Sequence, residues 1–272
     1  MNTELSIPEL QQIARKLRRD IVTMIATAGS GHPGGSLSAV EILTTLYFKV
    51  LSHRPDDPHW QDRDRFILSK GHAAPVLYAT LAECGYFPVE ELMTLRKLGS
   101  RLQGHTDHNI LGVEMSAGSL GQGLSFGIGC ALAARLDKKP NRIYVVMGDG
   151  ECDEGQVWEA AMAASHFKLD NLVAIVDRNG LQIDGWTKDI MNTEPMSDKW
   201  QAFGWHAIDI DGHDIALLMD AFKHAEAVKR QPTVIIAHTI KGKGVSFMEN
   251  NVDFHGKAPN PAQLETALKE LA

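Results

Sequence analysis

The sequence predicts an α/β fold with an open, mostly parallel sheet and helices on both faces. Two continuous apolar runs, at residues 143–147 and 172–177, have the pattern of parallel strands covered on both sides. An alanine-rich helical segment at residues 153–167 joins them, which makes a βαβ unit. Other helical and strand patterns alternate along the chain without a linker, repeat or low-complexity segment. We therefore expect residues 1–272 to form a single domain.

The remaining elements follow in order along the chain. Ser6, Pro8 and Glu9 form a capping box with proline in the first turn, which predicts a helix that ends near Ala28. A glycine-rich break follows. Further helices are expected at residues 38–51, 73–84, 121–136, 214–229 and 261–271, and further strands at 65–69, 207–210 and 233–239. Residues 99–119 lack periodicity and predict a long loop, a feature that is usually functional or mobile in compact domains.

Composition and charge exclude several classes of protein. The 272 residues are 44% apolar and 22% charged, which is typical of a soluble globular protein. The formal net charge is −7 and no basic stripe offsets it, which argues against a nucleic-acid surface. The start, Met1 to Ser6, is polar and does not resemble a signal peptide. No apolar run approaches the roughly 20 residues that span a bilayer, so no membrane segment is expected.

Three cysteines, Cys84, Cys130 and Cys152, lack a CxxC spacing and leave an odd count. This pattern favours reduced thiols in a cytoplasmic protein over a disulfide framework or a zinc site. Cys152 follows a glycine-rich turn, which raises the hypothesis of a nucleophile. Because no partnered base is evident, we expect it to be a small buried side chain.

Polar residues follow the predicted strands at their carboxyl ends, where open α/β sheets bind ligands. Gly148-Asp-Gly150 follows one strand, and Asn179 follows the next. The glycines let the backbone approach a ligand closely, and the helix beginning near Asp153 offers free N–H groups to an anion. Asp149, Asn179 and the Leu181 carbonyl are hard oxygen donors that, together with diphosphate oxygens, suit Mg²⁺ or Ca²⁺. Singly these motifs are commonly turns, but at adjacent strand ends they predict a diphosphate and metal site.

Further motifs extend over nearly the whole chain. They are Ser30-Gly-His-Pro-Gly34, Asp62-Arg-Asp-Arg-Phe66, Ser69-Lys-Gly-His72, Gly118-Ser-Leu-Gly-Gln-Gly123, Gly180-Leu-Gln-Ile-Asp-Gly185 and Asp211-Gly-His-Asp214. With Gly148-Asp-Gly150 and Asn179, they resemble the transketolase family in the family's own order. The resemblance covers only the first of the family's three domains. It implies the thiamine-diphosphate-binding fold, specifically the PP domain that holds the diphosphate.

The resemblance also implies a role for each matching residue. The metal ligands would be Asp149, Asn179 and the Leu181 carbonyl. Thiamine diphosphate would be contacted by His72, Gly118, Leu120, Gly150, Asn179 and His255. The catalytic residues would be His32 and His105, which would face the reactive carbon and the donor sugar. Glu154 would meet a catalytic glutamate across a subunit interface.

Two stretches depart from the family's pattern. The family commonly has proline where Ser119 stands, which affects the stiffness of that loop and not its contacts. Residues 241–246, Lys-Gly-Lys-Gly-Val-Ser, resemble the shorter members and the deoxyxylulose-phosphate synthases.

The twelve histidines divide into two groups. His32, His72, His105 and His255 lie in glycine-flanked loops and can donate to phosphate or sugar oxygens. His213, in the Asp211-Gly-His-Asp214 motif, is left unassigned. The others are expected to be ordinary surface or core residues: His53, His59, His108, His166, His206, His224 and His238.

The family's chemistry requires a second domain. The cofactor carries a two-carbon ketol unit between sugar phosphates, and its activation depends on a glutamate from a pyrimidine-binding domain. No glutamate in this chain resembles that residue. The resemblance therefore implies the N-terminal subunit of a split transketolase, inactive until a C-terminal subunit completes an α₂β₂ assembly. Such an enzyme would serve the pentose phosphate pathway or a more specialised sugar catabolism.

Other functions remain open at this point. The α subunit of a 2-oxo-acid dehydrogenase also binds diphosphate, but Gly31-His-Pro-Gly-Gly35 and His105 resemble the sugar-handling enzymes. A non-catalytic binding remnant is disfavoured because the predicted site residues are intact. A dinucleotide site at Gly121-Gln-Gly123 is weaker still, since no strand closely precedes it. The sequence leaves open the sugar pair, the partner chain and the identity of the metal.

Overall fold

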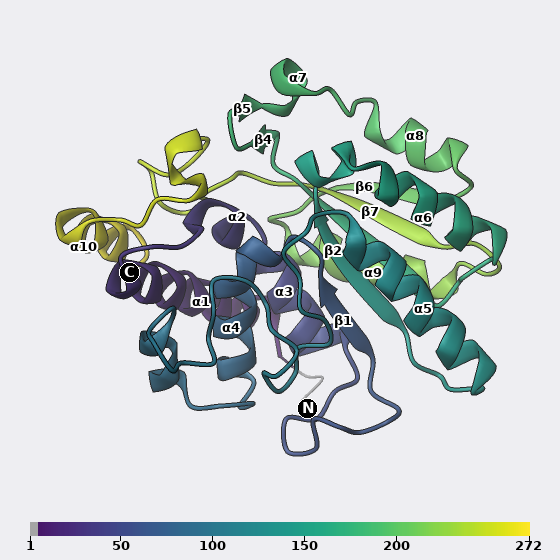
Figure 1. Ribbon diagram of the computed structural model, residues 1–272, viewed down its shortest axis with the longest axis horizontal. Helices are drawn as coiled ribbons and strands as arrows, with labels where there is room; N and C mark the ends of the chain where they lie inside the picture. The colour runs from purple at the N-terminus through teal and green to yellow at the C-terminus, as the bar shows by residue number, and fades with distance from the viewer. Residues whose placement is uncertain (1–4) are drawn as a thin grey trace.

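The computed structural model describes residues 5–272 and contains a five-stranded sheet between two layers of helices (Figure 1). The strand order is β1-β2-β3-β7-β6, and each neighbouring pair is parallel. The strands are β1 (Arg65–Leu68), β2 (Ile143–Gly148), β3 (Leu172–Arg178), β6 (His206–Asp211) and β7 (Thr233–His238). A short antiparallel hairpin, β4 (Leu181–Gln182) with β5 (Gly185–Trp186), follows β3 outside this sheet. The predicted parallel α/β sheet is confirmed.

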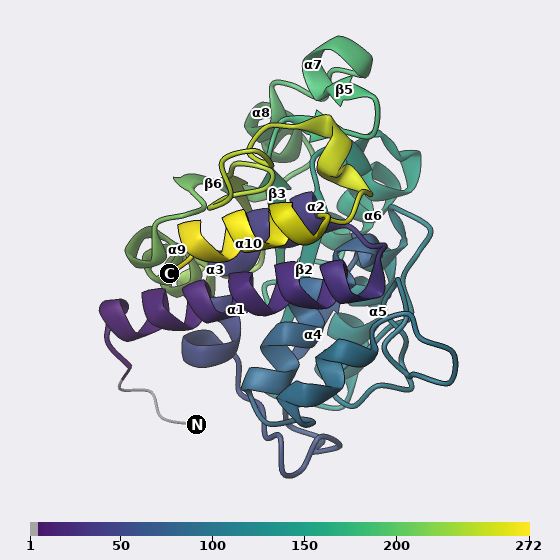
Figure 2. The same ribbon diagram turned by 90° about the vertical axis from the view of Figure 1, so that its left-hand side faces the viewer.

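Helices cover both faces of the sheet, as Figures 1 and 2 show. On one face lie α1 (Ile7–Ala28), α3 (Val40–Thr45), α4 (Ala74–Glu83) and α9 (Ile215–Ala227). On the other lie α5 (Gln122–Leu136), α6 (Gly155–His166) and α8 (Met196–Ala202). The remaining helices are α2 (Pro33–Ser38), α7 (Thr187–Ile190) and α10 (Pro261–Glu270), the last of which packs against α1.

The central strands explain why the apolar runs are continuous. Along β2, Tyr144 and Val146 pack into the cluster beneath α1, α3 and α4. Val145 and Met147 point the other way, into the cluster beneath α5 and α6. Because helices cover both faces of the sheet, the residues that point to either face must be apolar. The alternation of apolar and polar residues that marks a one-sided strand is therefore absent.

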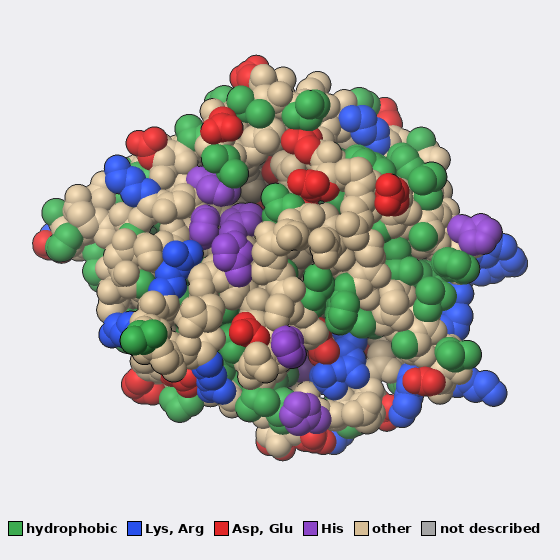
Figure 3. Space-filling model, viewed as in Figure 1, with side chains coloured by type: hydrophobic (Ala, Val, Ile, Leu, Met, Phe, Trp, Pro, Cys, Tyr) green, Lys and Arg blue, Asp and Glu red, His purple; other side chains and the backbone are tan. Residues whose placement is uncertain are grey.

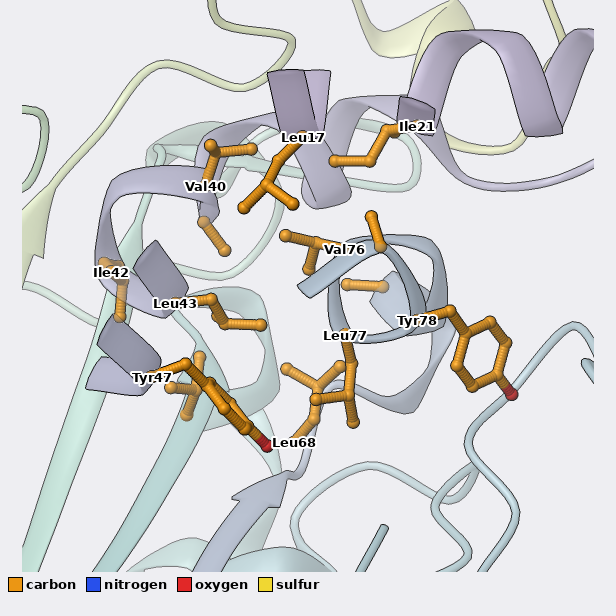
Figure 4. Close-up of a cluster of buried hydrophobic side chains, with 14 of the residues drawn as sticks. Leu17, Ile21, Val40, Ile42, Leu43, Tyr47, Leu68, Val76, Leu77 and Tyr78 are labelled. Atoms are coloured by element: carbon orange, nitrogen blue, oxygen red, sulfur yellow. The ribbon is translucent and has the colours of Figure 1, made fainter. Parts of the chain in front are cut away.

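The first layer is closed by side chains from α1, α3 and α4. Figure 4 shows Leu17, Val40 and Val76 meeting above Leu68 of β1. The capping box that starts α1 is present, since the amide and hydroxyl of Ser6 both donate to Glu9 Oε2 at 2.7 Å. Burying such aliphatic side chains contributes about 1.5–3 kcal/mol each, which fixes the layer on the sheet.

Two helices start two or more residues away from the predicted position. The segment expected at residues 38–51 begins earlier, as α2 at Pro33, and continues through α3 into a π-helical turn over Leu46–Val50. Pro33 suits a first helical turn. A Cβ at Gly34 would lie 2.9 Å from the Phe254 carbonyl oxygen. Close packing, and not backbone flexibility, therefore explains why glycine stands at this position. The helix expected from residue 153 begins at Gly155, after a 3₁₀ turn over Gly150–Asp153.

The loop predicted at residues 99–119 contains no helix or strand, as expected. No helix among residues 5–272 combines the length and apolar character needed to cross a bilayer. The polar start that argued against a signal peptide lies mainly in residues 1–4, outside the described residues. The three cysteines are unpaired, and Cys152 is buried, with its thiol donating to the Gly148 carbonyl at 3.5 Å. Burial raises the pKa of Cys152, which excludes a ready nucleophile.

Candidate functional site

A cavity of about 250 Å³ opens at the carboxyl ends of β1, β2 and β3. The space-filling view shows histidine side chains gathered in a hollow at this position (Figure 3). Every site residue predicted from the sequence lines the cavity except Glu154. These residues are His32, His72, His105, Gly118, Leu120, Asp149, Gly150, Asn179, Leu181 and His255. Segments up to about 220 residues apart in the sequence therefore meet at one end of the sheet.

The ends of β2 and β3 bring Asp149 against the turn that carries Asn179. Asp149 Oδ2 accepts from the amide of Gly180 at 2.6 Å, and Oδ1 accepts from the amide of Gly150 at 3.0 Å. Asn179 Oδ1 accepts from the amide of Leu181 at 3.1 Å. The Asp149 and Asn179 residues are only 2% and 7% exposed. Both side chains are thus anchored to the backbone of residues 180–181, and both line the cavity.

The chemistry of these donors fits a hard divalent cation. A carboxylate, an amide oxygen and the Leu181 carbonyl are all oxygen ligands, which Mg²⁺ and Ca²⁺ prefer. No group of three or more His, Cys, Asp and Glu side chains within residues 5–272 could hold a metal alone. Burial, and next the nearby Asp177, raise the pKa of Asp149 to about 6. A bound cation would relieve this cost, and oxygens of an anionic ligand would complete its coordination.

Lys241 is a cavity residue that the sequence analysis did not identify. Its Nζ donates to the Leu181 carbonyl at 3.0 Å and lies 3.0 Å from His255 Nδ1. Burial, and next Lys70, lower its pKa to about 8. The ammonium therefore contacts the carbonyl that the sequence predicts to be a metal ligand. A cation on that carbonyl would displace Lys241 and leave its charge for the anionic ligand.

A buried ion pair adjoins the cavity, which Lys70 lines. Lys70 Nζ donates to the Asp177 carboxylate and, at 2.7 Å, to the Gly35 carbonyl. Asp177 also accepts from the hydroxyls of Ser38, at 2.6 Å, and Thr239. Burial alone would raise the pKa of Asp177, but Lys70 and the hydroxyl donors hold it below its usual range. This network fixes the end of β3, two residues before Asn179.

Glu151 is a second buried carboxylate that the sequence did not reveal. It is 3% exposed and accepts from the Ser69 hydroxyl and from the amides of Gly121, at 2.8 Å, and Gly148, at 3.0 Å. These three donors lie after β1, before α5 and at the end of β2. Glu151 therefore ties the loop that carries Leu120 to the strand ends.

The four predicted histidines form one cluster around His32. The centroid of the His32 ring lies 5.3 Å from His72, 5.8 Å from His105 and 5.5 Å from His255. Burial is the main cause that lowers their pKa values, to about 4 for His32 and about 3 for His255. They are thus neutral at pH 7 and present polar N–H groups without bulk. The Nδ1 atom of His32 is buried without a hydrogen-bond partner in the described chain, which suits it to a polar ligand.

Glu154 does not join the cavity. Glu154 is exposed and precedes α6. It lies against Gly121: a Cβ added to Gly121 would lie 2.8 Å from the Cβ of Glu154. The helix expected near Asp153 starts at Gly155, after the 3₁₀ turn Gly150–Asp153, and Gly150 and Glu151 of that turn line the cavity. The two extra residues of turn let Glu151 reach back to the Gly148 amide.

Gly71 provides a test of the packing between two cavity loops. A Cβ at Gly71 would meet the backbone carbonyl of Ala117, beside Gly118. We expect Gly71→Ala to cost about 1–3 kcal/mol of stability, because backbone must shift, and to weaken thiamine diphosphate binding. Gly129→Ala is the control: it lies within α5 with nothing in reach of the new Cβ, and should stabilise by about 0.5–1 kcal/mol. Urea unfolding and calorimetric titration measure both effects; equal behaviour of the two variants would contradict the packing argument.

Comparisons with known proteins agree with this geometry. Residues 9–271 match the family model described as "Transketolase, thiamine diphosphate binding domain". The chain is 46% identical to the 6-deoxy-6-sulfo-D-fructose transketolase subunit SqwG of Clostridium sp. (strain MSTE9), covering 97% of this chain and 96% of that protein. It is 42% identical to one subunit of the apulose-4-phosphate transketolase of Phocaeicola vulgatus, over 98% and 95% of the two chains.

Larger transketolases match over only part of their length. Human transketolase is 42% identical over 96% of this chain but 42% of its own. The crystal structure of transketolase from Campylobacter jejuni superposes with a TM-score of 0.93 at 33% identity, covering 98% of this chain and 43% of that one. The chain thus spans less than half of these enzymes and nearly all of the separate subunits. It belongs to the transketolase family, as the family's thiamine diphosphate binding domain.

Proposed function

We propose that this chain is the N-terminal subunit of a two-subunit transketolase, which transfers a two-carbon ketol unit between sugar phosphates. The observation that carries the proposal is the cavity itself. Oxygen donors for a cation and a cluster of neutral histidines line one hollow, while the chain spans only 42% of the length of human transketolase. Similar separate subunits match this chain over 96% and 95% of their own length, which supports a second polypeptide as the source of the residues that complete the reaction.

In this proposal the metal is Mg²⁺ or Ca²⁺, held by Asp149, Asn179 and the Leu181 carbonyl. The diphosphate is contacted by His72, Gly150 and His255, to which we add Lys241 because its ammonium already reaches His255. Gly118 and Leu120 face the aminopyrimidine. Thiamine diphosphate, when bound, supplies the carbanion-stabilising chemistry of ketol transfer. His32 and His105, whose ring centroids lie 5.8 Å apart, orient the sugar through neutral N–H groups.

We further propose that the partner carries the pyrimidine-binding domain and that the assembly is α₂β₂. Glu154 supports this arrangement, because it is exposed beside Gly121 at the edge of the cavity, where an incoming subunit can reach it. The unpaired cysteines suit the reducing cytoplasm. Both apolar clusters flank the same sheet, which supports one domain for the whole chain.

The names of the relatives support an anionic sugar, phosphorylated or sulfonated, as the substrate class and do not select one. One similar subunit is named for a sulfonated fructose and another for apulose 4-phosphate, at 46% and 42% identity. A 2-oxo-acid dehydrogenase subunit is disfavoured, because the relatives described above are transketolases. A non-catalytic remnant is disfavoured by the intact oxygen donors and histidines of the cavity.

Reconstitution tests the proposal. The isolated chain with thiamine diphosphate and Mg²⁺ should bind the cofactor but give no measurable ketol transfer, because no glutamate of this sequence resembles the family's catalytic glutamate. Addition of the pyrimidine-domain subunit should restore turnover with one of a panel: xylulose 5-phosphate, 6-deoxy-6-sulfofructose or apulose 4-phosphate. The panel includes pyruvate with lipoamide as the control for 2-oxo-acid chemistry. Full turnover by the isolated chain, or activity with pyruvate alone, would contradict the proposal.

A further inference from the structure

The histidine of the Asp211-Gly-His-Asp214 motif is fully engaged although it does not line the cavity. His213 Nδ1 lies 2.9 Å from Glu41 Oε2, and His213 Nε2 accepts from the amide of Ile240 at 2.8 Å. A backbone amide can only donate, so Nε2 carries no proton and Nδ1–H donates to Glu41. The two contacts therefore fix both the tautomer and the orientation of the ring.

Glu41 connects His213 to a second contact with the same segment. Arg18 Nη1 and Nη2 lie 2.6 Å and 2.7 Å from the Glu41 carboxylate, and Arg18 Nε donates to the Lys243 carbonyl at 3.0 Å. Arg18 and Glu41 are only 6% and 8% exposed. Burial alone would raise the pKa of Glu41, but Arg18 and next His213 hold it at about 2, so the carboxylate is charged. We call Arg18, Glu41 and His213 the buried triad.

The buried triad forms hydrogen bonds with the backbone on both sides of Lys241. It holds the amide of Ile240, immediately before Lys241, and the carbonyl of Lys243, two residues after it. Gly242 is fixed independently, by its amide donating to the Gly34 carbonyl at 3.0 Å. Lys241 extends from this fixed backbone into the cavity, where its Nζ reaches the Leu181 carbonyl. Side chains from α1, α3 and the β6–α9 turn thus fix the backbone position of Lys241, although none of them contacts its side chain.

We propose that His213 is a positioning residue for Lys241 and that, through the Ile240 amide, it sets the affinity of the cavity for the anionic part of its ligand. The inference rests on the proposed function for the identity of that ligand. Residues that orient metal ligands without touching the metal typically account for about 10–100-fold in affinity, and we expect the same range here. A residue with only a structural role would change stability and leave affinity unchanged.

Two conservative variants separate the contacts of the ring. His213→Gln places an acceptor near the position of Nε2 and keeps the bond from the Ile240 amide. His213→Asn places its amide near the position of Nδ1 and keeps only the bond to Glu41. The matched control is His53→Asn: both nitrogens of His53 are likewise engaged, 2.9 Å from the Tyr86 hydroxyl and 2.8 Å from the Tyr47 carbonyl, and it does not line the cavity.

Two measurements on the full chain read the effect. Calorimetric titration with thiamine diphosphate and Mg²⁺ should show an affinity about 10–100-fold lower for His213→Asn, and within about threefold of the parent for His213→Gln. His53→Asn should retain parental affinity even if its unfolding midpoint falls. Hydrogen exchange without cofactor should show faster exchange of the Ile240 amide in His213→Asn and not in His213→Gln.

Several results would overturn the proposal. Parental affinity in His213→Asn, or equal losses in the Asn and Gln variants, would show that the Ile240 contact does not act on the cavity. If His213→Asn does not fold, hydrogen exchange of the parent chain tests the contact. An Ile240 amide that exchanges at the rate of an unprotected amide would exclude its hydrogen bond to His213. Absence of thiamine diphosphate binding in the parent would instead contradict the proposed function, and the exchange rates would still decide whether His213 holds the segment.

Discussion

Asp149→Asn should abolish Mg²⁺-dependent binding of thiamine diphosphate, lowering affinity by at least about 100-fold. Loss of a residue that only supports a metal ligand costs about 10–100-fold, and loss of the charged ligand itself should cost no less. The variant keeps the size of the side chain and one acceptor for the amides of Gly150 and Gly180, so the fold should persist. Calorimetric titration with and without a chelator measures the metal-dependent part directly.

Asp189→Asn is the matched control for this substitution. Asp189 is an exposed carboxylate in α7, outside the residues that line the cavity, and its replacement removes the same charge. Affinity should remain parental, which separates the loss of a ligand from the loss of one negative charge. If Asp149→Asn bound the cofactor as tightly as Asp189→Asn, the assignment of Asp149 as a metal ligand would be wrong.

Removal of the buried carboxylate of Asp177 should destabilise the chain by about 3–5 kcal/mol, because it leaves the Lys70 ammonium buried without its counter-charge. The Lys70 and Asp177 side chains are only 2% and 0% exposed, so water cannot replace the partner. A loss of this size is a large part of the roughly 5–15 kcal/mol that stabilises a typical domain. Urea unfolding of Asp177→Asn at pH 7 measures it.

The pH dependence of this loss has a definite sign. The folded-state pKa of Asp177 is below its usual range, so the contribution of the carboxylate is complete above the unfolded value of about 3.9. It is lost as the pH falls through the lower folded pKa, and the difference between parent and variant should shrink there. Lys269→Met is the control, since the Lys269–Glu265 pair is exposed, and it should cost less than about 0.5 kcal/mol. Similar losses in the two variants would contradict the buried ion pair.

The main elements of the fold follow from local patterns in the sequence. The strands β2 and β3 are predicted from continuous apolar runs, and α1 from its capping box, because these signals need no distant partner. The early start of α2 is not predictable in this way, because two glycines are poor helix formers in isolation. Gly34 packs against Phe254 and Lys241, and Gly35 against His72 and Lys70, so contacts far along the chain stabilise the helix in its place. The hairpin β4–β5 and helices α7 and α8 are short and carry no clear period.

The candidate site is predictable where residues form a motif and unpredictable where they act at a distance. Asp149 and Asn179 follow adjacent strands, so their proximity follows from the topology of a parallel sheet. Lys241 reaches the Leu181 carbonyl across 60 residues, and Lys70 reaches Asp177 across 107. Glu151 directly follows the Gly148-Asp-Gly150 motif, yet its partners are a hydroxyl and two amides that no spacing reveals. The glycine-rich sequence around Lys241 is the only local signal of a functional lysine.

Crystallographic localisation of Mn²⁺ bound with thiamine diphosphate would test the proposed cavity chemistry most directly. Mn²⁺ replaces Mg²⁺ in oxygen sites and gives an anomalous signal that identifies its position. We expect one strong peak about 2.1–2.3 Å from oxygens of Asp149, Asn179 and Leu181, with Lys241 turned from the Leu181 carbonyl to the diphosphate. A peak among the ring nitrogens of His32, His72 and His255, or a bound cofactor with no metal between its diphosphate and Asp149, would contradict it.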